Sequence, residues 1–196
     1  MTPKTIILTL ILLIFTIPSS LQAKEKPTIS RQLWKNAHLS WDVYRTDDYR
    51  WRNIAIGTGY GDNFDFDNKA YWLVGLDYNW GKYTLYSDGA YAMGVDNAIL
   101  RTKSLSIPVV AGYQVYKKLS RSMKIYTGPV LELILSSKLD GHNYDEIQNT
   151  QLGWTVGTKF RFLFIFGAHV AYSYYPTALF TNGDLQRNAI SFSLGF

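Results

Sequence analysis

The last nine residues, 188–196, alternate between large apolar side chains and small ones. Ile190, Phe192, Leu194 and the terminal Phe196 fall on one side of an extended strand, while two serines and a glycine fall on the other. An alternation of this kind that ends on an aromatic residue is typical of the closing strand of an outer-membrane β-barrel, where one face meets lipid and the other a polar interior. A soluble β-sandwich can also end on such a strand, so the rest of the chain decides between the two classes.

The same two-residue period recurs in seven earlier segments. We predict strands at residues 53–60, 70–80, 82–93, 104–115, 124–135, 152–162 and 164–174. With the last strand they make eight, an even number as single-chain bacterial barrels require, and each is close to the length that crosses a bilayer when tilted. The sequence therefore predicts an all-β fold, a closed eight-stranded antiparallel up-and-down barrel. Side chains just fill the interior of a barrel of this size, so we expect no open pore.

The face that carries the charges separates a membrane barrel from a soluble ligand-binding barrel. One face of each predicted strand carries bulky apolar and aromatic residues and no ionised group. The other carries small polar residues together with Asp77, Asp88, Glu132, Lys159 and Arg161. Charges in an apolar core are costly unless paired, whereas they are ordinary in the polar lumen of a membrane barrel. We therefore expect these five residues to form a lumenal charge network.

Within that network, Glu132 and either Lys159 or Arg161 lie on neighbouring predicted strands and are expected to pair. An internal salt bridge that stabilises the polar interior is the favoured interpretation. A gating or ligand-binding charge pair is the alternative.

The N-terminus has the pattern of a secretory signal peptide. Lys4 precedes an apolar run from residue 6 to 17, and small residues follow up to Ala23, the expected cleavage position, with Ser20 as a second candidate. The apolar run is shorter than the roughly 20 residues that a spanning helix needs. We therefore expect residues 1–23 to be removed and the mature chain to reach the bacterial outer membrane.

Residues 24–52 have a different pattern from the predicted barrel, which begins at residue 53. Ile29, Leu33, Ala37 and Trp41 recur at spacings that suit a basic amphipathic helix, whereas Leu39, Trp41 and Val43 equally suit a short strand. We expect a periplasmic N-terminal extension. A helix on the membrane, a partial plug of the barrel and a loosely ordered lead-in all remain open for it.

The connections between the predicted strands differ in length. Long polar connections are expected at residues 61–69, 94–101, 136–149 and 176–187, and short ones at 81–82 and 117–121. This fits outer loops, inner turns and two periplasmic termini. Residues 160–166 contain no Gly, Pro, Asn or Asp, so either a tight turn of poor turn formers or one long strand lies there.

Several short motifs resemble the PorT-like outer-membrane barrel family of the Bacteroidetes. Residues 105–113 read LSIPVVAGY and residues 124–130 read KIYTGPV, and they are followed by GWTVG at 153–157, YSYY at 172–175 and SLGF at the end. The resemblance extends over residues 53–196. It implies an outer-membrane barrel and, for some members of that family, a role in the type IX secretion system.

Two functions are consistent with these patterns. The first is a structural or protein-interaction barrel of the cell envelope. Its expected partners are outer-membrane lipid, the barrel-assembly machinery through the strand ending at Phe196, and a periplasmic or secretion-system protein. The alternative is a lipid-modifying barrel enzyme, an acyl hydrolase or transferase.

His169 and Ser173 are the residues that would suggest an acyl hydrolase. They lie four apart on one predicted strand, a separation of about 13 Å that exceeds hydrogen-bond reach. We therefore predict no catalytic residues and no enzymatic activity.

The chain has no cysteine, which excludes a thiolate metal site. It also has no zinc-ligand spacing, no glycine-rich phosphate loop and no stacked basic and aromatic surface. We expect no cofactor, no metal and no nucleic-acid partner.

Overall fold

A computed structural model describes residues 29, 32–33, 36–46, 49–64, 67–86, 98–118, 121–162, 166–181 and 186–195. The predicted signal peptide, Asp88 and Phe196 lie outside these residues. The strands are β1 (His38–Arg45), β2 (Tyr49–Phe64), β3 (Asp67–Leu85), β4 (Ile99–Lys118), β5 (Arg121–Leu139), β6 (His142–Asn143), β7 (Thr150–Phe162), β8 (Phe166–Tyr175) and β9 (Arg187–Gly195).

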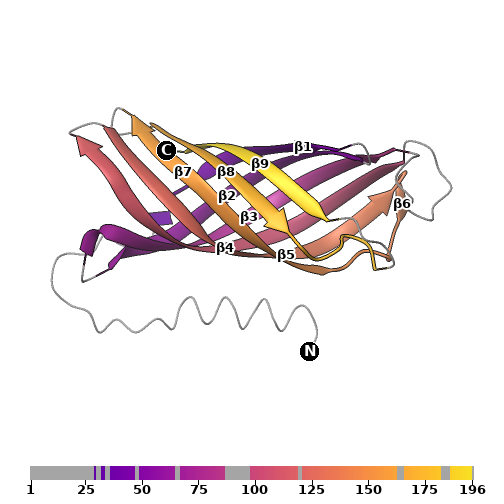
Figure 1. Cartoon of the computed structure of the whole chain (residues 1–196). Helices are drawn as coiled ribbons and strands as arrows, with labels where there is room; N and C mark the ends of the chain where they lie inside the picture. The colour runs from indigo at the N-terminus through magenta and orange to yellow at the C-terminus, as the bar shows by residue number, and fades with distance from the viewer. Residues whose placement is uncertain are drawn as a thin grey trace.

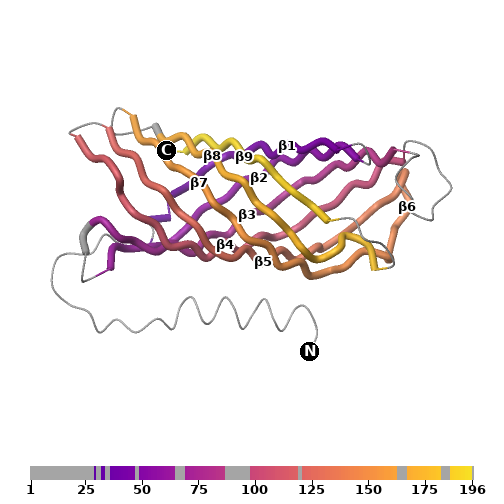
Figure 2. Tube along the Cα trace, in the orientation of Figure 1, coloured from indigo at the N-terminus to yellow at the C-terminus, as the bar shows by residue number. Residues whose placement is uncertain are grey.

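The strands form one sheet that closes on itself (Figures 1 and 2). Each long strand pairs antiparallel with the next one along the chain, and β9 returns to pair with β1, where Leu39 lies opposite Leu194. β6 is only two residues long. It follows a tight turn at Asp140 and Gly141, whose φ angles are 47° and 94°, and pairs antiparallel with the end of β5. The predicted eight-stranded closed up-and-down barrel is confirmed.

Two strand assignments are wrong. One strand was missed and another was divided into two, so the predicted number of eight is still correct. β1 lies inside the predicted extension and β2 begins at Tyr49, so the barrel starts at His38 rather than at residue 53. The predicted turn at Gly81 and Lys82 does not exist, because β3 runs through it. A Cβ on Gly81 would lie 2.5 Å from Thr102 Oγ1, so this glycine permits a close approach between strands rather than a turn.

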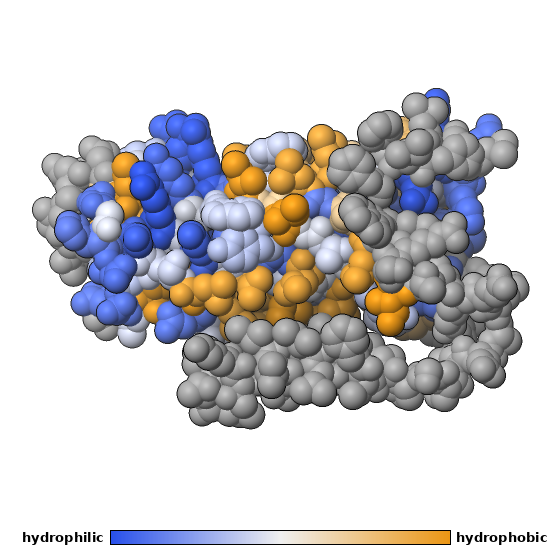
Figure 3. All heavy atoms as spheres, turned by 180° about the vertical axis from the view of Figure 1, so that it is seen from behind, coloured by the Kyte–Doolittle hydropathy of each residue, from blue (hydrophilic) through white to orange (hydrophobic). Residues whose placement is uncertain are grey.

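Apolar side chains face outward around the barrel, and the space-filling view shows hydrophobic residues over the middle of the wall (Figure 3). The exposed ones include Leu39, Trp41, Val43, Ile54, Ile56, Leu76, Val109, Leu152, Trp154, Val156, Phe192 and Leu194. Tyr83 and Leu85 are bulky residues of the predicted strand 82–93, but they are buried inside at 1% and 4% exposure. Because β3 does not turn at residue 81, the alternation continues and places them in the lumen.

β7 and β8 are separate strands, so the chain turns between residues 160 and 166 rather than forming one long strand. β7 ends at Phe162 and β8 begins at Phe166, and these two residues are opposite one another in the antiparallel ladder. The described part of the chain has no helix long and apolar enough to cross a membrane.

The two ends of the barrel differ. We call the end where β1 begins and β9 ends the terminal end. The opposite end, where β6 lies at the right of Figure 1, is the loop end. β1 starts opposite Gly57, so residues 58–64 of β2 extend beyond it at the terminal end.

Candidate functional site

A packed cluster of apolar side chains closes the loop end. This loop-end cluster comprises Tyr49, Trp51, Tyr83, Leu85, Ala98, Leu100, Ile134, Ile147, Leu179, Phe180 and Ala189. Leu100 and Leu179 are fully buried. Ile147 and Phe180 come from connections between strands and form a β-bridge with each other. The described residues of these connections therefore pack into the barrel and fill its opening at the loop end.

An ion pair lies next to this cluster. Arg187 of β9, 1% exposed, pairs with Glu132 of β5 and donates a hydrogen bond to Tyr83 Oη at 2.9 Å. Its Cζ lies 3.7 Å from the centre of the Tyr175 ring, and the other oxygen of Glu132 accepts a hydrogen bond from Ser104. Buried charges are retained at low cost only when they are paired and hydrogen-bonded in this way.

Glu132 does not pair with Lys159 or Arg161, contrary to the prediction. In the ladder between β5 and β7, Glu132 lies opposite Gln151, whereas Lys159 lies opposite Lys124. Lys159 is eight residues beyond Gln151, a distance of about 26 Å along the strand. The register therefore places the acid near the loop end and the bases near the terminal end.

On the terminal side of the ion pair, a cavity of about 390 Å³ occupies the lumen and extends to the terminal end. Glu132 and Tyr175 line it at one end, and Asp62, Lys124 and Arg161 line it at the other. Arg161 is exposed, which shows that the lining near the terminal end reaches solvent. The lumenal cavity is thus closed at the loop end and open at the terminal end.

The middle of the cavity is a row of hydrogen-bonded polar side chains from four adjacent strands. Asn53 Nδ2 donates to Asp42 Oδ2 at 2.6 Å and to Asn79 Oδ1 at 2.9 Å. Asn79 Nδ2 in turn donates to Ser106 Oγ at 2.8 Å. Because these buried groups have partners within the wall, the row stabilises a polar lumen.

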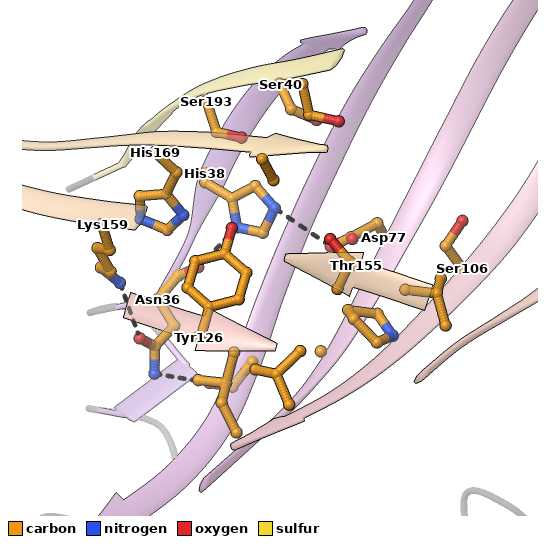
Figure 4. Close-up of a pocket in the computed structure, with 18 of the residues that line it drawn as sticks. Asn36, His38, Ser40, Asp77, Ser106, Tyr126, Thr155, Lys159, His169 and Ser193 are labelled. Atoms are coloured by element: carbon orange, nitrogen blue, oxygen red, sulfur yellow. Dashed lines mark hydrogen bonds and ion pairs between the residues drawn. The ribbon is translucent and has the colours of Figure 1, made fainter. Parts of the chain in front are cut away.

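A histidine and an aspartate meet nearer the terminal end (Figure 4). His38 Nε2 lies 3.2 Å from Asp77 Oδ1, and His38 Nδ1 lies 2.9 Å from the carbonyl oxygen of Asn36. His38 is on β1 and Asp77 on β3, so the contact passes over Gly57 of β2. A Cβ at Gly57 would lie 1.8 Å from Asp77 Oδ1, so a larger residue at this position would displace the carboxylate from His38.

The second lumenal histidine, His169 of β8, lies beside His38 with its ring centre 5.9 Å away (Figure 4). Ser173 is on the same strand, but its hydroxyl donates to Thr155 Oγ1 at 3.0 Å.

Residues before β1 lie across the terminal mouth of the cavity. Gln32, Leu33 and Asn36, which we call the strap, bond to the part of β2 that β1 leaves uncovered. Asn36 Nδ2 donates to Gly59 O at 2.9 Å, and Gln32 Oε1 accepts from Gly61 N at 3.4 Å. Across the lumen, Lys159 Nζ donates to Asn36 Oδ1 at 3.4 Å. Of the alternatives for the extension, these contacts favour a partial plug.

The expected five-residue network is divided between separate places. Asp77, Glu132, Lys159 and Arg161 all line the lumenal cavity, but Asp77 is bound to His38 and Glu132 to Arg187. Sequence reasoning missed His38 and Arg187 because we assigned them to the extension and to a loop. The alternation along each strand could have identified them. His38, Ser40 and Asp42 lie on one face of an extended strand, and so do Arg187 and Ala189. In the described part of the chain, no group of three or more His, Asp or Glu side chains is placed to hold a metal ion.

Comparison with known proteins gives one family match and two structural likenesses. The sequence model of a family described as "Outer membrane protein beta-barrel domain" matches residues 7–196. The crystal structure of the outer membrane enzyme PagL is 15% identical with a TM-score of 0.48, and covers 81% of this chain and 96% of its own. CdiB from Acinetobacter baumannii is 16% identical with a TM-score of 0.28, over 71% of this chain and 31% of its own. No curated protein matches the chain.

The likeness to PagL corrects one prediction. We expected no enzymatic activity because His169 and Ser173 lie too far apart along their strand, and that expectation is wrong, because a barrel similar to this one is described as an enzyme. At this identity and TM-score the likeness assigns no activity to the chain. The finer resemblance to the PorT-like family stays a prediction.

Proposed function

Since this chain belongs to the outer-membrane protein β-barrel domain family and lies in the bacterial outer membrane, we propose that it is a binding barrel. Its lumenal cavity receives a ligand, or a segment of a partner protein, from the periplasm. Barrels of this kind have longer loops outside and shorter turns in the periplasm. The terminal end, where the lumenal cavity opens, therefore faces the periplasm.

The observation that carries this proposal is the asymmetry of the lumen. The loop-end cluster and the ion pair between Glu132 and Arg187 fill one end, whereas exposed polar residues line the other. A volume of about 390 Å³ lies within the usual range of ligand pockets, roughly 300–1,000 Å³. A polar lining is ordinary in a membrane barrel, so the feature that favours a binding role over a purely structural one is that the space opens at one end only.

Single cysteines test the proposal, because the chain has none of its own. Ser122→Cys places a thiol at the mouth of the lumenal cavity, and His142→Cys places one at the loop end as a matched control. With a membrane-impermeant maleimide, we expect the control to react in intact cells and Ser122→Cys to react only after the periplasm is opened. We also expect Ser122→Cys to react more slowly in native membranes than after purification, because the occupant shields it. Labelling of Ser122→Cys in intact cells, or equal rates before and after purification, would refute the binding role.

The resemblance to the PorT-like family extends this proposal to a secretion-system protein as the periplasmic partner. The periplasmic opening supports it, since a periplasmic component can reach that end. A strain lacking the chain is expected to retain type IX cargo, and the wild-type gene should restore release. Normal release without the chain would count against the secretion link and leave the binding role standing.

A second candidate, a lipid-modifying acyl hydrolase or transferase, is favoured by the contact between His38 and Asp77. A carboxylate that orients an imidazole is the arrangement of a general base. Ser40 and Ser193 are direct cross-strand neighbours close to this pair and are the candidate nucleophiles. Because both nitrogens of His38 already have partners, catalysis requires Nδ1 to leave the Asn36 carbonyl, so we place binding first.

Fatty-acid release from phospholipid by the purified barrel tests this second candidate. His38→Asn and Asp77→Asn should each abolish release, and His142→Asn, a change at an exposed histidine, should not. Wild-type protein that releases no fatty acid would eliminate the hydrolase.

A further inference from the structure

Three basic side chains converge at the terminal mouth of the lumenal cavity. Lys124 of β5 and Lys159 of β7 are direct cross-strand partners, and Arg161 lies two residues further along β7, opposite Ser122. All three line the cavity, so they share one face of the wall. We call Lys124, Lys159 and Arg161 the basic cluster.

This arrangement is unfavourable without a counter-charge. Like charges placed directly opposite one another on adjacent strands destabilise a sheet. In the described part of the chain, no carboxylate lies within ion-pair distance of the basic cluster. Asp77 is engaged by His38 and Glu132 by Arg187, so two of the lumenal acids are already used.

The three bases have weak partners within the protein. Lys159 donates to an amide oxygen at the long distance of 3.4 Å. Lys124 Nζ lies 4.3 Å from the centre of the Tyr71 ring, a cation–π contact that leaves its N–H groups available. Arg161 is exposed. These donors point into an open cavity whose carboxylate at the same end is Asp62, and no ion pair among the described residues joins Asp62 to the basic cluster.

We propose that the basic cluster binds a phosphate-bearing ligand that enters the lumenal cavity from the periplasm. Three cations suit a doubly charged oxyanion better than a single carboxylate, and a guanidinium fork matches phosphate oxygens in a bidentate way. The phosphate belongs either to a small soluble compound of the periplasm or to a phospholipid headgroup of the inner leaflet. This inference rests on the proposed binding function and specifies its ligand.

Calorimetric titration of the purified full-length barrel in a maltoside detergent tests the inference. The soluble probe is inorganic phosphate, and the lipid probe is dihexanoyl phosphatidic acid, with dihexanoylglycerol as the phosphate-free control. Lys124→Gln/Lys159→Gln removes two charges of the basic cluster. Arg101→Gln/Lys103→Gln removes two exposed charges of β4 near the loop end and is the matched control.

We expect wild type and the β4 variant to bind at least one phosphate probe equally, and the basic-cluster variant to bind it at least tenfold more weakly. Similar affinity for both probes assigns a soluble ligand, and phosphatidic acid binding ten times tighter assigns a lipid headgroup. Equal affinity of wild type and the basic-cluster variant would overturn the inference, as would no binding of either probe. If Ser122→Cys is still labelled only from the periplasm and still shielded in native membranes, such a failure removes the phosphate assignment and leaves the binding role intact.

Discussion

Arg187 of β9 and Glu132 of β5 form a buried ion pair across the lumen, joining two strands that are not neighbours in the barrel. The pair lies between the loop-end cluster and the lumenal cavity, since Arg187 contacts Tyr83 while Glu132 lines the cavity. It thus connects opposite walls where the polar part of the lumen ends.

Replacing one partner leaves the other charge buried and unpaired. We expect Arg187→Met to lower the free energy of unfolding by about 3–5 kcal/mol, the usual cost of breaking such a pair. Glu132→Gln/Arg187→Met should be less destabilised than Arg187→Met, because neither charge remains. Urea unfolding from lipid vesicles measures both. A double variant as unstable as the sum of its two single variants would contradict the coupling.

Gly57→Ala is expected to separate His38 from Asp77. The added methyl group would lie 1.8 Å from Asp77 Oδ1, so the carboxylate must move, at a cost of about 1–3 kcal/mol. Gly167→Ala is the control, because the nearest atom to its Cβ would be at an ordinary 3.6 Å. Urea unfolding gives the cost, and an upfield or downfield change of the His38 ring signals in NMR spectra reports the lost contact. Equal stability of the two variants would show that Gly57 is not required for close approach.

Lys159→Gln is expected to stabilise the ligand-free barrel slightly. It removes the repulsion between Lys159 and Lys124, which we place at about 0.2–1 kcal/mol, and the gain should shrink in high salt. Lys103→Gln, at an exposed position of β4, controls for the loss of a lysine. A loss of stability in Lys159→Gln, independent of salt, would mean that the hydrogen bond from Lys159 to Asn36 outweighs the repulsion from Lys124.

Asn36→Ala should loosen the strap at the terminal mouth. Asn36 bonds to Gly59 and Lys159, and each such hydrogen bond contributes about 0.5–1.5 kcal/mol. We expect a thiol at Ser40→Cys inside the lumenal cavity to react with maleimide several-fold faster in this background. Asn143→Ala, at the loop end, is the control and should leave the rate unchanged. Unchanged labelling in Asn36→Ala would show that the strap does not restrict entry.

The facing of the side chains could be read from the sequence because it depends only on local alternation. Val109 and Phe192 face outward as that alternation predicts, and Glu132 faces inward. Strand boundaries were harder, because Gly81 and Lys82 have the composition of a turn while lying within β3. In β1, Trp41 belongs both to a helical period that begins at Ile29 and to a two-residue period with Leu39 and Val43, and only pairing with β2 and β9 decides between them.

Contacts across the lumen could not be predicted in this way. Glu132 meets Arg187, and His38 meets Asp77, because of the register of several successive ladders, and a shift of one ladder would change both partners. The sequence pattern gives the face of the strand on which each residue lies, but not how far each strand is shifted relative to its neighbours in the closed sheet. Neighbouring pairs such as Lys124 and Lys159 depend on that register too.

The proposed binding role requires a lumen that is closed at the loop end and open at the terminal end. Ser193→Cys places a thiol on the inward face of β9, in the lining of the lumenal cavity. In proteoliposomes with one orientation, an impermeant maleimide should label it from the terminal side and leave it unlabelled from the loop side. Labelling from the loop side at a comparable rate would contradict the account, because it would mean that the loop-end cluster does not close the barrel.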